Sequence, residues 1–131
     1  MLRKFFFFAA FAVAFVCAQT QQDADVAGDT DYQKADRELT SVYGKIIEEY
    51  KDDAAFIAAL RASERAWIKF RDAEVTMKFP ETEPGYYGSS YPMCVSAYKA
   101  ELTRARTREL RQWLDGAPEG DVCGGSVKTK E

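Results

Sequence analysis

The sequence predicts an all-α protein, a compact bundle of three main amphipathic helices that follows a cleaved N-terminal signal peptide. Apolar residues recur at the 3.6-residue helical period in three segments, whereas the alternation typical of strands and internal repeats are absent from the sequence. Stretches rich in proline, glycine or aspartate separate the three segments, so each helix has its own start and stop signals. Three such helices would bury their apolar stripes against one another.

Residues 1–18 have the pattern of a secretory signal peptide. Arg3 and Lys4 precede an apolar run over residues 5–16, and Val16-Cys17-Ala18 offers small or permissive residues for cleavage. The run is too short for a permanent transmembrane helix. The alternative is a lipoprotein with a lipidated Cys17, for which Val16 is a poor preceding residue. We therefore expect an exported protein, periplasmic or secreted, without a stable membrane span.

Charge and composition exclude several classes of function. Removal of residues 1–18 would leave 16 basic and 21 acidic residues, a net charge of −5. This balance argues against a general nucleic-acid binder, which needs a basic face for phosphates. It suits a cationic partner, although a modest acidic excess also simply favours solubility. The chain has no histidine, no nucleophile motif and no metal-ligand cluster, so we expect no enzyme, no cofactor and no metal.

The predicted helical domain covers residues 31–115. A polar, acidic lead-in over residues 19–30 is expected to be flexible. The first helix should begin near Asp31, the second should run from about residue 53 to 78, and the third should start at Ser89 or Ser90 and stop before Gly116. The three apolar stripes expected in the core are Ala35, Leu39, Val42, Tyr43, Ile46 and Tyr50; Phe56, Leu60, Trp67, Phe70 and Met77; and Val95, Tyr98, Leu102, Ala105, Leu110 and Trp113.

Two cysteines would remain after loss of the signal peptide, Cys94 and Cys123. An even pair in an exported protein is most simply one disulfide, worth about 3 kcal/mol if unstrained. We therefore expect the flexible tail, residues 116–131, to be tied back by this bridge.

The connection over residues 79–93, FPETEPGYYGSSYPM, has the composition of a recognition loop. Tyrosine among glycine and serine combines rigid contact area with adaptable hydrogen bonding. Glutamates in the same segment would aid encounter with a cationic partner. The alternative is that one or two tyrosines fold back on the bundle and the rest only connect helices. The candidate partner-binding residues are Glu81, Glu83, Tyr86, Tyr87, Ser89, Ser90 and Tyr91.

Three parts of the sequence together resemble the LprI-type lysozyme-inhibitor family of small exported bacterial domains. They are residues 35–43 (ADRELTSVY), residues 60–74 (LRASERAWIKFRDAE), and residues 87–90 (YGSS) with 102–110 (LTRARTREL) behind them. The resemblance covers roughly residues 32–114. It implies a protein that binds and blocks a muramidase. The alternative is a cell-envelope interaction module that binds a different protein, a toxin or a peptidoglycan fragment.

Family members often carry two cysteines that would join the second and third helices, where this chain has Val75 and Tyr98. The resemblance therefore implies that Cys94 and Cys123 form a different staple. It also highlights charged residues that could be mistaken for an acid–base site. Arginines close to these carboxylates would keep them ionised, the wrong state for a general acid. We predict a structural ion-pair network of Asp36, Arg65, Arg71, Asp72, Glu74 and Arg106.

Overall fold

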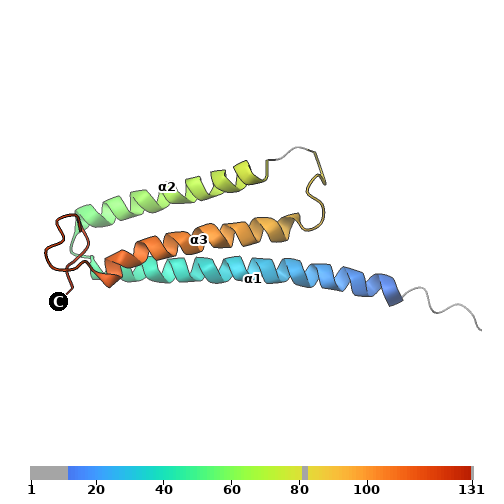
Figure 1. Cartoon of the computed structure of the whole chain (residues 1–131), viewed down its shortest axis with the longest axis horizontal. Helices are drawn as coiled ribbons and strands as arrows, with labels where there is room; N and C mark the ends of the chain where they lie inside the picture. The colour runs from blue at the N-terminus through green and yellow to red at the C-terminus, as the bar shows by residue number, and fades with distance from the viewer. Residues whose placement is uncertain (1–11, 81–82, 131) are drawn as a thin grey trace, which may run out of the picture.

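The computed structural model describes residues 12–80 and 83–130, with side chains from residue 30 onward. Three helices account for most of it: α1 (Ala12–Glu49), α2 (Ala54–Lys78) and α3 (Tyr91–Asp115). α1 and α3 run side by side in the same direction, and α2 runs in the opposite direction as a separate outer layer (Figure 1). The predicted three-helix, all-α fold is confirmed. The only β-pairing in the described segments is an isolated bridge between Ala117 and Thr129.

The core lies mainly in the seam between α1 and α3. α1 buries the apolar stripe expected from its sequence, and Ile46 is completely inaccessible. α3 presents mostly small side chains to this stripe, because Ala100, Thr103 and Thr107 are buried while Leu110 lies at its end. The stripe predicted for α3 was therefore largely wrong: of its six members only Leu110 is fully buried, although Trp113 packs against the core from its edge.

Threonine can replace larger apolar residues in the seam because its hydroxyl is satisfied within α3. Thr103 donates a hydrogen bond to the Lys99 carbonyl at 2.8 Å, and Thr107 donates to the Thr103 carbonyl at 2.9 Å. The polar atom of each side chain is thus bonded inside its own helix, and burial leaves no unpaired group. Short side chains on α3 let the two helix backbones approach closely.

α2 packs more loosely, and its predicted buried face was partly wrong. Leu60 and Arg71 are its buried residues, and Phe56 and Trp67 pack against the core beside them. Phe70 and Met77, expected in the core, are 54% and 68% exposed. Successive helical residues are rotated by about 100°, so these two side chains lie well round the helix from the face that carries Leu60 and Arg71.

α1 starts earlier than we expected. The helix begins at Ala12 and includes residues 19–30, which the sequence indicated as a flexible lead-in. This segment contains no proline, the strongest helix breaker, so the helix can continue through it toward the N-terminus. Residues 1–11 of the predicted signal peptide lie outside the described residues. Within the described part, no helix has both the length and the apolarity needed to span a membrane.

The predicted disulfide is wrong, because Cys94 and Cys123 are both free and exposed. Cys94 lies in the first turn of α3, whereas the tail returns to the last turn of that helix. α3 has 25 residues and therefore rises about 37 Å, far beyond the roughly 6 Å between Cα atoms that a disulfide can bridge.

Hydrogen bonds hold the tail instead of the disulfide. The backbone N–H of Lys128 donates to the Tyr50 hydroxyl at 3.0 Å, and the indole N–H of Trp113 donates to the Ser126 hydroxyl at 3.0 Å. The ammonium groups of Lys128 and Lys130 donate to the carbonyls of Glu49 and Leu114, near the ends of α1 and α3. The tail is thus held on the bundle by these hydrogen bonds and not by a disulfide of Cys123.

Candidate partner-binding loop

The loop between α2 and α3 reverses the chain at one end of the bundle. α2 ends where the N–H of Phe79 donates to the Val75 carbonyl at 2.9 Å. Gly85 and Gly88 adopt φ angles of 80° and 71°, in the left-handed region that other residues rarely adopt, and so provide the two turns. Pro92 lies in the first turn of α3, where its missing N–H costs no hydrogen bond. Among the candidate contact residues, Glu81 lies outside the described residues.

Phe79 is the centre of an aromatic cluster that the sequence did not single out. Its ring meets those of Tyr87 and Tyr91 edge to face, with centroids 5.8 Å away in each case, and that of Tyr98 at 6.4 Å. Tyr87 and Tyr91 also stack on each other at 5.3 Å, and the Tyr87 hydroxyl donates to the Pro80 carbonyl at 2.9 Å. Such ring pairs contribute about 0.5–1.5 kcal/mol each beyond their burial. Two of the three loop tyrosines therefore form the loop's own small core.

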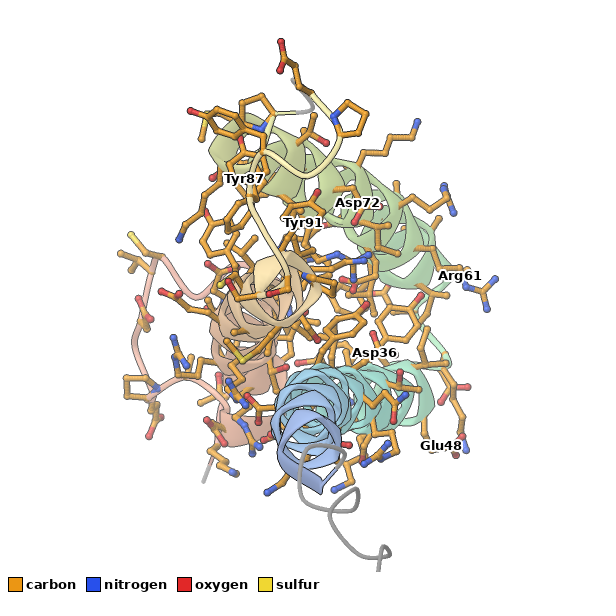
Figure 2. The ribbon with its side chains drawn as sticks, turned by 90° about the vertical axis from the view of Figure 1, so that its right-hand side faces the viewer. Asp36, Glu48, Arg61, Asp72, Tyr87 and Tyr91 are labelled. Atoms are coloured by element: carbon orange, nitrogen blue, oxygen red, sulfur yellow. The ribbon has the colours of Figure 1, made fainter. Side chains whose placement is uncertain are left out.

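Tyr86 behaves differently from the other two tyrosines. It is 70% exposed, and its ring stands edge to face on Tyr87 at 5.0 Å. Figure 2 looks onto this end of the molecule and shows Tyr87 and Tyr91 close together in the loop. The loop surrounds an open hollow of about 560 Å³, lined by Glu83, Pro84, Gly85, Tyr86, Tyr87, Gly88, Ser89, Tyr91 and Pro92.

The hollow is suited to binding rather than to acid–base chemistry. Partial burial, and then the neighbouring Tyr86 and Tyr91, raise the pKa of Tyr87, so its hydroxyl stays neutral at physiological pH. The lining offers aromatic faces, hydroxyls, peptide groups and the exposed carboxylate of Glu83. No group of three or more potential metal ligands occurs in the described segments.

Arg71 joins α2 to α1 through Tyr32, and two neighbours on α2 hold its guanidinium in place. Its guanidinium donates to the Asp72 carboxylate at 2.9 Å and to the Tyr32 hydroxyl at 3.2 Å. It also lies 5.3 Å from the centre of the Trp67 ring, within cation–π range. Burial raises the pKa of Tyr32, and the positive charge of Arg71 opposes that rise.

Arg106 joins α3 to α2 in a similar way. Its guanidinium donates to Glu64 at 3.1 Å and to Ser63 at 2.9 Å, and lies 5.9 Å from the centre of the Trp67 ring. Trp67 therefore has two arginines as neighbours, one from its own helix and one from α3. The charged residues that the resemblance highlights thus contribute to the attachment of α2.

The remaining members of the proposed ion-pair network are more dispersed. Glu74 accepts a hydrogen bond from the Tyr98 hydroxyl at 3.2 Å, and burial followed by this bond raises the pKa of Tyr98. Arg65 is exposed and has no ion pair with any described residue. Asp36 lies on the side of α1 that faces α2 (Figure 2), in a small hollow of about 170 Å³ that Trp67 and Arg71 also line.

Comparison with known proteins decides the family. A family model described as "Lysozyme inhibitor LprI" matches residues 17–110 of the chain. The chain belongs to the LprI family. A similar protein is an uncharacterised one from Rhizobium meliloti strain 1021, 38% identical over 111 residues that cover 76% of this chain and 78% of that protein. A crystal structure of a DUF1311 family protein from Pseudomonas putida KT2440, which is of the same family, is similar in fold. It has a TM-score of 0.60 and 26% identity, and the match covers 69% of this chain and 89% of that one.

The sequence did not indicate that Phe79 and Tyr98 belong to the aromatic cluster beneath the loop of this LprI family member. Phe79 precedes Pro80 and could have been recognised as the last side chain that α2 can direct toward the loop. Tyr98 was assigned to the core stripe of α3, and only its position in space brings it to Phe79.

Proposed function

We propose that this LprI family member is an exported protein that binds a lysozyme-type muramidase and blocks its cleft with residues 79–93. The observation that carries the proposal is the exposed Tyr86 ring, supported from below by Tyr87. The family description supports the choice of target. Blocking a cleft requires occupancy and shape, so this function needs no catalytic group.

The aromatic cluster supports binding because it reduces the entropy lost on association. A loop of 15 residues that had to be ordered on contact would lose much of its binding energy to that ordering. Here Tyr87 and Tyr91 are already packed on Phe79, so among the three loop tyrosines only the exposed Tyr86 side chain would have to be ordered on contact. A rigid aromatic side chain that enters a pocket of the partner is the type of residue that dominates interface energetics.

Charge supports the encounter rather than the final affinity. Glu83 is exposed at the rim of the hollow, and the full chain carries a net charge of −3. A cationic muramidase would be attracted to this acidic surface, and the association rate would fall as salt screens the attraction.

Titration of a c-type lysozyme with the protein, followed by its cell-wall lysis activity, tests the proposal. We expect saturable inhibition by the wild type, and about 10-fold or greater weakening in Tyr86→Ala, because truncation of a central aromatic contact costs about 2 kcal/mol or more. Phe70→Ala is the matched control, since it removes another exposed aromatic ring that lies on α2 instead of in the loop.

Two results would contradict the proposal. Absence of inhibition by the wild type at large molar excess over several lysozymes would exclude a muramidase as the target. Equal weakening by Tyr86→Ala and Phe70→Ala would exclude the loop as the specific contact.

A further inference from the structure

We propose that the outer face of α2 docks on an anionic phospholipid surface. The face carries three basic residues at four-residue intervals, Arg61, Arg65 and Lys69, which form one ridge along the helix. All three are exposed, and none forms an ion pair with any described residue. Arg61 projects away from the bundle in Figure 2. We call these three residues the basic ridge.

None of the three acidic residues of α2 pairs with the ridge, because each has another partner. Glu64 bonds to Arg106, and Asp72 bonds to Arg71 and lies 3.9 Å from Lys99. Glu74 accepts the hydrogen bond of Tyr98. The carboxylates of Glu64 and Glu74 thus face the bundle, and exposed Asp72 is paired with Arg71 of its own helix, whereas the three cations of the ridge face solvent without an ion pair to any described residue.

An exposed apolar stripe follows the ridge along the same helix. It consists of Ala62, Ala66, Phe70, Ala73 and Met77, all exposed and spaced at the helical period. Phe70 and Met77 are the large members. A helix with an apolar stripe flanked by lysine and arginine is the pattern of segments that lie in a bilayer interface, with cations on phosphates and apolar side chains between headgroups.

The geometry favours a lipid surface over two other occupants. The stripe is centred near residue 70, so a second copy paired antiparallel along it would bring Lys69 next to Lys69 of that copy, and like charges in this position repel. An acidic protein would need a groove to receive a straight convex helix, whereas a flat bilayer needs none. The basic ridge spans about 12 Å, so several headgroups could meet it at once. At physiological salt the Debye length is about 8 Å, so acidic residues on the far side of the bundle are largely screened.

Vesicle co-sedimentation tests the proposal with the full chain. We compare vesicles of phosphatidylcholine with vesicles that contain phosphatidylglycerol. Arg61→Gln/Arg65→Gln/Lys69→Gln should weaken partitioning to the anionic vesicles by about 100-fold, at roughly fivefold per basic residue. The matched control is Lys34→Gln/Arg37→Gln/Lys45→Gln, which removes the same charge from exposed positions of α1. The apolar N-terminal segment is common to all variants, so the differences report on α2.

The expected result is a preference for anionic vesicles that the α2 triple variant loses, that the α1 triple variant keeps, and that Phe70→Ser reduces. Equal loss in both triple variants would overturn the proposal, since net charge alone would then explain binding. Equal binding of both variants and the wild type would also overturn it. If poly-glutamate binds the wild type while vesicles do not compete, the ridge serves an acidic protein and the lipid proposal fails. The lysozyme titration is independent of these outcomes, because it depends on the loop.

Discussion

The seam between α1 and α3 buries Ile46 and Leu110 almost completely. α2 differs, because Arg71 and Arg106 link it to the other two helices while the Phe70 side chain on the same helix is exposed to solvent. The seam between α1 and α3 depends on close packing of apolar and small side chains. α2 depends more on a few directional contacts of charged groups with aromatic rings. The difference teaches that charged residues within a family motif need not mark the function, since here Arg71 and Arg106 contribute to holding the least tightly packed helix in place.

The largest expected effect comes from a cavity in the seam. Ile46→Ala should lower the free energy of unfolding by about 2–5 kcal/mol, because the side chain is completely buried and its neighbours cannot fill the space. Urea denaturation followed by circular dichroism measures it. Met77→Ala on α2 is the control and should change stability by less than about 0.5 kcal/mol. A loss below 1 kcal/mol for Ile46→Ala would contradict the seam as the main core.

A smaller effect is expected from the attachment of α2. The side chains of Arg106 and Glu64 are only 12% and 14% exposed, so Arg106→Met leaves Glu64 with an unpaired charge and should cost about 1–3 kcal/mol. Amide hydrogen exchange should show faster exchange in α2, with α1 and α3 largely unchanged.

The double variant Arg106→Met/Glu64→Gln provides the control for that pair. It removes both charges and should recover part of the stability lost by the single variant. Uniform loss of protection over all three helices would show that the pair stabilises the whole bundle, and the distinction between seam and layer would then fail.

The smallest effect concerns alkaline pH. Burial raises the pKa values of Tyr32 and Tyr98, which bond to Arg71 and Glu74 of α2. Because the folded state holds these protons more tightly than the unfolded chain, their stabilisation is complete below the ordinary tyrosine pKa of about 10. It is lost as pH rises through the higher folded values. Spectroscopic titration of tyrosinate, with hydrogen exchange, should show α2 loosening first. Tyr98→Phe should reduce this dependence, and an unchanged titration would contradict the assignment.

The sequence predicted best where one physical effect dominates. The stripe of α1 is strictly periodic and almost entirely buried. α3 was misjudged because Thr103 and Thr107 count as polar until their hydroxyls are seen bonded within the helix. α2 was misjudged because periodicity shows which side chains share a face but not which of two apolar faces packs inward.

The candidate site was predicted only in outline. The composition of residues 79–93 indicated a contact loop, yet the separate roles of Tyr86 and Tyr87 depend on Phe79, which tertiary structure brings beneath them. The disulfide failed for a related reason. Counting cysteines gives a possible pairing, but the length of α3 between Cys94 and the tail decides against it.

The tail has one further consequence for the parallel pair. Because α1 and α3 run in the same direction, the negative ends of their helix dipoles, each equivalent to about half an electronic charge, lie at the same end of the molecule and repel. Lys128 and Lys130 bring one ammonium group to each of these ends, at the carbonyls of Glu49 and Leu114. The C-terminal segment thus supplies two built-in counterions, which favour a parallel arrangement that the two helices alone would oppose.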